Sequence, residues 1–274
     1  MSNAADDARA RAARTYNAAA DTYDDPANSF WERFGRRTVE RLELPKGAHV
    51  LDVCCGAGAS ALPAAEIVGP SGSVLGVDIA ERLLENARAK ARARGLDNAR
   101  FQVGDLLNLK LSNTGFDAVV CVFGIFFVPD MVPALRSLWA HVRPGGKLAI
   151  TTWGPRFFEP ATSAFWKSIQ QERPDLYKNF NPWDRICDPH SLGALFAQAG
   201  IAGPEVAAEA NTHPIASPEA WWAAVLGSGY RGTVDQLDAP ARERVRAANL
   251  EFIRASGTTS VEANVVYAVA RKNR

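Results

Sequence analysis

Short hydrophobic runs recur along the first half of the chain at intervals of about 15 to 30 residues. Several are continuous in apolar residues, as expected of strands that are buried on both faces of a sheet. The run at Phe116–Val122 (FDAVVCV) is the clearest case. The predicted strands are His49–Val53, Ser73–Asp78, Arg100–Val103, Phe116–Val122 and Lys147–Trp153.

Segments with helical periodicity lie between these runs, at residues 59–67, 81–94 and 132–142. Strands that alternate with helices over short links predict an α/β fold with a parallel sheet covered on both faces. Two further helices are predicted before the first strand, at 5–24 and 29–42. Ser29 is a suitable N-cap for the second of them, with Glu32 as its capping-box partner.

The alternation loosens after Trp153, where prolines and aromatic residues are frequent up to Pro189. The predicted elements beyond that point are a helix at 191–199, a strand at 205–212, helices at 217–227 and 240–255, and a last strand at 260–270. We therefore expect three parts. These are N-terminal helices that form a lid (1–44), a cofactor-binding core (45–214 and 258–274), and a helical insertion near the substrate pocket (215–257).

The composition limits the classes of partner. The 274 residues carry 31 Lys and Arg against 30 Asp and Glu, a balance that argues against binding to nucleic acid or to a membrane surface. No apolar run is long enough to span a bilayer, and no signal-peptide pattern is present. We expect a cytoplasmic protein, monomeric or homodimeric, with a small-molecule substrate. The four cysteines lack metal-type spacing, so we expect reduced, packed thiols and no metal, with a redox role for Cys54-Cys55 as the alternative.

Candidate chemistry begins in the stretch VLDVCCGAG at residues 50–58, where a predicted strand runs through a small-residue turn into a helix. Glycine at Gly56 and Gly58 lets a ligand approach the backbone closely. Asp52 comes just before the turn. Its carboxylate repels a phosphate and suits a cation, such as the amino group of an amino acid.

Three more candidate positions follow the next three strands. Parallel strands present their carboxyl ends at one edge of the sheet, where such folds bind ligands. Asp78 can accept hydrogen bonds from both hydroxyls of a ribose. Asp105, within Gly104-Asp105-Leu106, can accept the exocyclic amino group of an adenine. Val122 and Phe123 end the fourth strand, where the chain turns towards the substrate side.

A dinucleotide-binding enzyme is the chief alternative from the motif. Gly56-x-Gly58-x-x-Ala61 followed by Asp78 also satisfies the fingerprint of NAD-dependent dehydrogenases. Asp52 speaks against a pyrophosphate at this loop, and a dehydrogenase does not require Asp105.

The ordered set of motifs resembles the class I S-adenosylmethionine-dependent methyltransferases, especially the small-molecule group related to the ubiquinone and menaquinone enzymes. The matching stretch runs from about Tyr16 to Trp153. It comprises YNAAADTYD at 16–24, VLDVCCGAG, GVDIA at 76–80, VGD at 103–105, FDAVVCVFGIFFVPD at 116–130 and RPGGKLAITTW at 143–153. The resemblance implies a Rossmann-like sheet of seven strands, the last one antiparallel, with helical lid elements.

The resemblance also implies roles for the matching positions. Asp52 and the loop Cys54–Gly58 would hold the methionine part of S-adenosylmethionine, and Tyr16 or Tyr23 would close over it. Asp78 would take the ribose, with Ile79 against the adenine, and Asp105 with Leu106 would bind the adenine edge. Cys54 departs from the family, which commonly has glycine or alanine there.

Aromatic residues are unusually numerous for a sheet core and suggest an apolar substrate pocket. The candidate substrate residues are Trp31, Phe127, Trp153, Trp183, Tyr230 and Arg231, the last as a partner for a substrate anion. His213 is the one histidine that we consider as a general base, although a packed or solvated histidine is the commoner case. We therefore predict methyl transfer to a small aromatic or apolar metabolite; a non-catalytic S-adenosylmethionine-binding protein is a further alternative.

Overall fold

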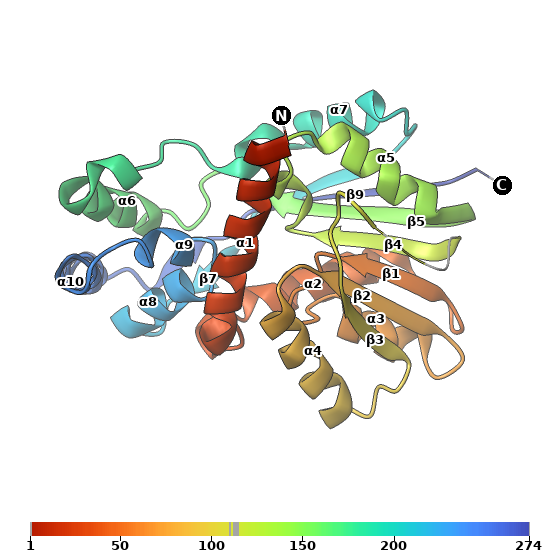
Figure 1. The fold of residues 1–274 in the computed structure, drawn as a ribbon, viewed down its shortest axis with the longest axis horizontal. Coiled ribbons are helices and arrows are strands. Elements are labelled where there is room, and N and C mark those ends of the chain that lie inside the picture. Colours follow the sequence, from red (N-terminus) through yellow and green to blue (C-terminus); the bar gives the residue numbers. More distant parts are fainter. Residues whose placement is uncertain (1, 110, 112–114, 274) are drawn as a thin grey trace.

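The computed structural model describes residues 2–109, 111 and 115–273. In this part of the chain seven strands form the main sheet, in the order β3-β2-β1-β4-β5-β9-β6. Their bounds are β1 His49–Val53, β2 Ser73–Asp78, β3 Ala99–Val103, β4 Phe116–Val122, β5 Val142–Trp153, β6 Glu205–Glu209 and β9 Val265–Arg271. The five neighbouring strands β3, β2, β1, β4 and β5 pair in parallel, and β9 is antiparallel to both of its neighbours, β5 and β6. The predicted fold class, including the antiparallel last strand, is confirmed (Figure 1).

Ten α-helices and four short 3-10 helices accompany the strands in the described residues. The α-helices are α1 Ser2–Tyr23, α2 Phe30–Leu42, α3 Ala61–Val68, α4 Glu81–Ala93, α5 Met131–His141, α6 Ala161–Glu172, α7 Pro189–Gln198, α8 Pro218–Leu226, α9 Arg231–Val234 and α10 Ala239–Ser256. The 3-10 helices are η1 Pro26–Asn28, η2 Ile125–Phe127, η3 Pro174–Leu176 and η4 Pro182–Ile186.

The central strands of the sheet are buried on both faces because their side chains alternate between two hydrophobic cores. Val50, Val74 and Val120 point to one core, which α2, α3 and α4 complete. Leu51 and Val119 point to the other, where α5 and α7 pack. The nearly continuous apolar strands that the sequence displays are explained by this double burial.

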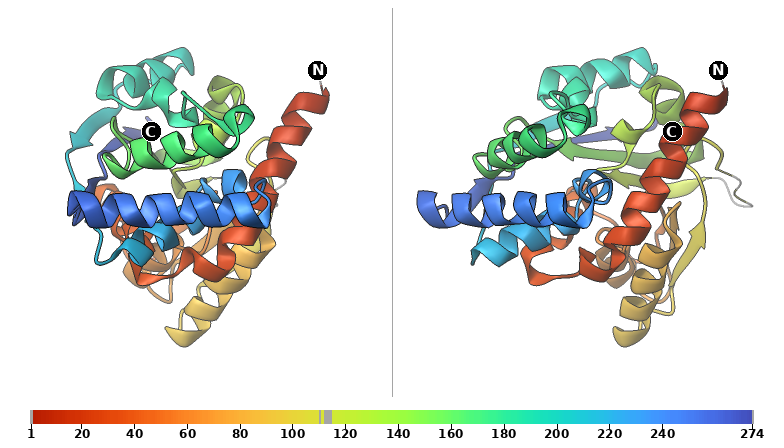
Figure 2. Two further views of the ribbon diagram at one scale, coloured as in Figure 1. Left: turned by 90° about the vertical axis from the view of Figure 1, so that its left-hand side faces the viewer. Right: turned by 60° about the vertical axis from the view of Figure 1, so that its left-hand side comes forward.

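A second group of helices lies beside the carboxyl ends of the parallel strands. Helix α10 packs against α6 and α8, and α9 joins α8. Figure 1 shows this group to one side of the sheet, with α1 running between the two. Helix α1 contacts α4 on one side and α8 and α9 on the other, and the rotated views of Figure 2 show the same position.

Two predicted strands are each divided between two sheets. The run at 205–212 forms β6 in the main sheet, and the chain then enters β7 (Thr212–Pro214). The run at 260–270 forms β8 (Ser260–Glu262) before β9. In the described part of the chain, β7 and β8 pair with each other and not with the main sheet. They lie at the two ends of the segment that carries α8 to α10. Asn264 marks the break, since its Oδ1 accepts a hydrogen bond from the backbone N–H of Asn211.

The structure differs from the sequence predictions at three places. Ser29 stands at the N-cap position of α2 but makes no side-chain capping hydrogen bond; it has helical dihedral angles, and its N–H bonds to the carbonyl of Pro26, the first residue of η1. Helix α6 was not predicted because its segment is rich in aromatic residues and follows prolines. Strand β5 begins at Val142, before the predicted start at Lys147, and the N–H of Gly145 bonds to the Lys272 carbonyl just beyond β9.

Candidate cofactor and substrate site

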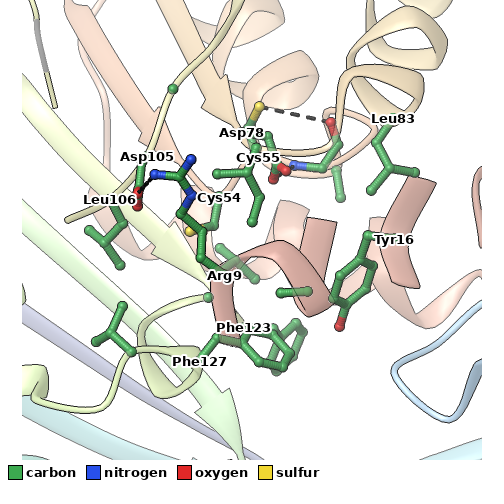
Figure 3. Close-up of a pocket in the computed structure, with 18 of the residues that line it drawn as sticks. Arg9, Tyr16, Cys54, Cys55, Asp78, Leu83, Asp105, Leu106, Phe123 and Phe127 are labelled. Carbon is green, nitrogen blue, oxygen red and sulfur yellow. Dashed lines mark hydrogen bonds and ion pairs between the residues drawn. The ribbon is translucent and has the colours of Figure 1, made fainter. Parts of the chain in front are cut away.

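A pocket lies at the carboxyl ends of β1 to β4, the edge that the sequence indicates, and α1 covers it (Figure 3). Most of the predicted cofactor residues line it: Tyr16, Tyr23, Cys54, Gly56, Asp78, Ile79, Gly104, Asp105, Leu106, Val122 and Phe123. We call it the cofactor pocket. Two predicted residues, Asp52 and Gly58, are not among its lining residues.

Asp78 fastens the glycine loop to the end of β2. Its Oδ2 accepts a 2.8 Å hydrogen bond from the N–H of Gly56, and its Oδ1 accepts one of 2.9 Å from Ala80. Burial raises the pKa of this carboxyl, while those backbone hydrogen bonds oppose the rise. A carboxylate has about four lone-pair positions, so Asp78 keeps two acceptor positions for hydroxyl groups in the pocket.

Asp52 lies directly behind the residues that line the pocket. It is 1% exposed, and its Oδ2 accepts a 2.7 Å hydrogen bond from the hydroxyl of Ser60, which does line the pocket. Its Oδ1 is buried without a hydrogen-bond partner among the described residues. Burial raises its pKa to about 7, and the hydrogen bond from Ser60 opposes that rise. Asp52 therefore acts on the pocket through Ser60.

Gly58 has a packing role. It has a φ of +85°, and a Cβ on it would lie 3.0 Å from Cγ of Leu62 and 3.4 Å from Cβ of Ala87. Its small size thus brings the loop onto α3 and α4, and Gly56 is the glycine that faces the pocket.

Two non-glycine residues of the pocket have left-handed backbones, Cys54 at φ +60° and Phe123 at φ +52°. They follow adjacent strands, β1 and β4. Gly124 makes room for Cys54, because a Cβ on Gly124 would lie 2.4 Å from that of Cys54. Strained backbones of this kind persist where the surroundings enforce them, and they concentrate at functional sites. The cysteine that departs from the family pattern is accommodated by this glycine.

Helix α1 supplies the tyrosines that close the pocket. The Tyr23 ring stacks on Trp31 with 5.2 Å between centroids, and the Tyr16 ring meets Phe127 edge-on at 5.7 Å. Burial raises the pKa of both phenols above the ordinary range, so both are neutral donors at neutral pH. Arg9 of the same helix pairs with Asp105 across the pocket at 3.2 Å, as Figure 3 shows.

A second pocket, lined mainly by aromatic side chains, adjoins the first. The residues common to both linings are Tyr16, Trp31, Phe123 and Phe127. The aromatic pocket is completed by Phe126, Trp153, Phe157, Trp166, Lys178, Phe180, Asn181, Pro182, Trp183, Ser228, Gly229, Tyr230 and Thr233. It includes the predicted substrate residues Trp31, Phe127, Trp153, Trp183 and Tyr230.

The remaining candidates are placed differently. Arg231 does not line either of these pockets and pairs with Asp235 at 2.8 Å. His213 lies in β7, is 2% exposed, and its Nε2 donates a 2.8 Å hydrogen bond to the Ala27 carbonyl. Burial lowers the pKa of this histidine. We therefore assign His213 to the packing between β7 and η1, and it is not retained as a base.

Sequence reasoning missed several lining residues, notably Arg9, Ser60 and Lys178. Ser60 lies just after the motif at 50–58, so a signal was present. Arg9 and Lys178 lie in segments without a motif, and folding alone brings them to the pockets. The described residues contain no group of His, Cys, Asp or Glu suited to hold a metal ion. Among these residues, no helix has the length and apolar character needed to cross a bilayer.

Comparisons with known proteins agree with this geometry. A family described as "Methyltransferase domain" matches residues 50–146. Aklanonic acid methyltransferase DauC of Streptomyces sp. (strain C5) is 34% identical over 182 residues, which cover 62% of this chain and 83% of that protein. Demethylmenaquinone methyltransferase of Geobacillus sp. (strain WCH70) is 37% identical over 111 residues, 40% of this chain. The match spans 47% of that protein, so this chain covers about half of its length.

Solved structures share the fold at low sequence identity. Phosphoethanolamine N-methyltransferase 2 of Haemonchus contortus, in complex with phosphomonomethylethanolamine and S-adenosylhomocysteine, superposes with a TM-score of 0.59. The two are 16% identical, and the superposition covers 97% of this chain and 60% of the other. The likeness extends to the arrangement of the sheet that carries the pocket.

Proposed function

This chain belongs to the class I S-adenosylmethionine-dependent methyltransferases, and we propose that it methylates a small aromatic acceptor bound in the aromatic pocket. The enzyme class and the cofactor follow from the family. The proposal concerns the acceptor and the residues that bind it. The observation that carries it is that one wall, made by Tyr16, Trp31, Phe123 and Phe127, belongs to both pockets.

The residues present fit S-adenosylmethionine. Asp78 has acceptor positions left for the ribose hydroxyls, while Gly56 leaves space that a side chain would fill. The buried, unpartnered Oδ1 of Asp52 favours positive charge nearby, and the amino group and sulfonium supply it. Asp105 and Leu106 lie at the third strand end, where the family binds adenine. These five residues, with Ser60, are our proposed cofactor contacts and supports.

Bound S-adenosylmethionine supplies a methyl group on a positively charged sulfur, which needs little further activation. The protein's contribution is alignment. The aromatic side chains of the shared wall favour a cation in the cofactor pocket and a planar ring in the aromatic pocket. Phe123 stacks on Trp153 at 3.9 Å, which holds its ring in place. The ring of the acceptor is thereby held flat against the shared wall, beside the methyl group that is transferred.

Exclusion of water is the second contribution. We propose that residues 1–44 and the insertion 215–257 form the lid, together with α6. Helix α1 touches both α4 and α9, so a movement of α1 opens or covers both pockets at once. Closing them removes bulk water from the developing charges, which strengthens the electrostatic contacts in the site.

The two alternatives are not favoured. The named relatives are methyltransferases. Asp52, Asp78 and Asp105 place three carboxylates around the pocket or just behind it, an environment that repels the pyrophosphate of NAD.

The direct test is a calorimetric titration with S-adenosylhomocysteine, followed by a mass-spectrometric screen of aromatic metabolites for a gain of one methyl group. Once an acceptor is found, we expect Trp183→Ala to raise its KM at least tenfold and to leave the affinity for S-adenosylhomocysteine unchanged. Trp183 lines only the aromatic pocket of the two. An acceptor KM that Trp183→Ala does not change would remove this pocket from the proposal.

A further inference from the structure

Lys178 brings a positive charge into the aromatic pocket. It lies in the segment between η3 and η4, and the residue as a whole is exposed. Its ammonium is nevertheless turned inward. Nζ donates a 3.3 Å hydrogen bond to Oγ1 of Thr233, which is 1% exposed and lines the pocket, and it lies 5.8 Å from the centroid of the Trp166 ring.

Among the side chains that the structure describes, no carboxylate pairs with this charge. Among the described residues that line the aromatic pocket, Lys178 is the one charged side chain, and it forms no ion pair with any described residue. Withdrawal from solvent lowers the pKa of Lys178, and the like charge of Arg11 on α1 adds to this effect. An ammonium surrounded by aromatic walls and one hydroxyl is suited to receive an anion.

We infer that the acceptor is an aromatic molecule with an anionic oxygen group, a carboxylate or an ionised phenol, which binds Lys178. This inference rests on the proposed function and specifies its substrate class.

The position of Lys178 also separates the anion from the reacting atom. Lys178, Trp166 and Thr233 line the aromatic pocket and not the cofactor pocket, whereas methyl transfer occurs at the wall that the two share. The anionic group therefore anchors the acceptor and is not the atom that is methylated. Beside Lys178, Tyr177 and Phe180 are 41% and 53% exposed, so apolar surface continues at the rim. An acceptor with more than one ring can use this surface.

A matched pair of probes tests the inference. 2-Naphthoate and 2-naphthamide have the same ring system, and only the first is anionic. Each is titrated calorimetrically into the protein saturated with S-adenosylhomocysteine. We expect wild type to bind 2-naphthoate about tenfold more tightly than 2-naphthamide, because a charge-assisted hydrogen bond forms in a water-poor pocket. Lys178→Met should abolish this preference, and Lys178→Arg should retain most of it.

Lys167→Met is the control, because Lys167 is an exposed lysine of α6 outside the pocket lining, and its loss changes the net charge equally. Equal affinity of wild type for both probes, or a preference that survives in Lys178→Met, would overturn the role of Lys178 and leave the aromatic acceptor site standing. Binding of neither probe by protein that binds S-adenosylhomocysteine would count against the aromatic acceptor site as well.

Discussion

The N–H of Gly56 donates a 2.8 Å hydrogen bond to Oδ2 of Asp78, and this contact fixes the loop after β1 to the end of β2. The glycine and the acid are 22 residues apart and belong to two different motifs of the sequence. The acid holds the loop in its left-handed conformation, and we propose that its remaining lone pairs accept hydrogen bonds from the cofactor.

Asp78→Asn should weaken binding of S-adenosylhomocysteine by roughly 1–3 kcal/mol, about five- to 150-fold in Kd. The amide has one acceptor oxygen in place of two, so it cannot serve both backbone N–H groups and the ribose. Isothermal titration calorimetry measures the change. Asp97→Asn, at an exposed aspartate outside the pocket, is the control. Wild-type affinity in Asp78→Asn would exclude the ribose contact.

A comparison of Gly56→Ala with Gly95→Ala separates two effects of an added side chain, loss of space in the cofactor pocket and backbone strain. Both glycines have positive φ, +52° and +65°, so each alanine costs about 1 kcal/mol of folding free energy. A Cβ on Gly56 would lie 3.1 Å from the Tyr23 hydroxyl, whereas one on Gly95 meets nothing within 4 Å. We expect similar losses in urea unfolding, with weaker S-adenosylhomocysteine binding only in Gly56→Ala. Equal binding by the two variants would show that Gly56 does not face the cofactor.

The strand ends were predictable because each carries its chemistry within a few residues of an apolar run. Asp78 is the last residue of β2 and Asp105 lies two residues after β3, and a parallel sheet brings such positions to one edge whatever the loops between them do. The aromatic wall was predictable in part for the same reason, since Phe123 and Trp153 end β4 and β5. Residue type and order were sufficient for these positions.

The parts that were not predictable depend on contacts between distant segments. Helix α6 is defined by packing against α10, about 80 residues later, and its own periodicity is obscured by aromatic residues. The division of the late strands depends on β7 meeting β8, which only the tertiary fold decides. Asp52 was expected to touch the cofactor directly, and only the structure shows that it lies behind Ser60, which lines the cofactor pocket. The sequence around Lys178 does not indicate a binding role, because that role depends on Thr233 and Trp166, which only the fold brings close to it.

Asp52 should make stability and cofactor affinity respond to pH in opposite directions. Its pKa is about 7 in the folded protein and 3.8 ordinarily, so between these values the folded chain binds more protons than the unfolded one. Stability therefore falls as pH rises through this window. The same ionisation creates the negative charge that favours the amino group and the sulfonium, so affinity for S-adenosylmethionine should rise with pH.

Asp52→Asn tests both effects, because the amide cannot ionise. As pH is raised from 5 to 8, the melting temperature of the variant should increase relative to that of wild type. Its affinity for S-adenosylmethionine should decrease relative to wild type over the same range, and should be about tenfold weaker at pH 8. Thermal unfolding and calorimetry at several pH values measure the two curves. Wild-type and Asp52→Asn curves that stay parallel across this range would exclude titration of Asp52 near pH 7.

Asn249 joins α6, α8 and α10, three helices of the lid that we propose, and its loss should destabilise them without altering the cofactor pocket. It is 1% exposed, its Oδ1 accepts a 3.0 Å hydrogen bond from the indole of Trp221 on α8, and its Nδ2 donates to the hydroxyl of Ser168 on α6. Asn249→Ala leaves the indole N–H buried without an acceptor, which costs about 2–3 kcal/mol in urea unfolding. The Kd for S-adenosylhomocysteine should change less than twofold, because Asn249 does not line the cofactor pocket. Asn273→Ala, at an exposed asparagine, is the control.

The double variant Asn249→Ala with Trp221→Phe should lose less unfolding free energy than the sum of the two single changes, because Phe removes the donor that Asn249→Ala leaves without an acceptor. Additive losses would mean that the Asn249–Trp221 hydrogen bond does not link α8 to α10.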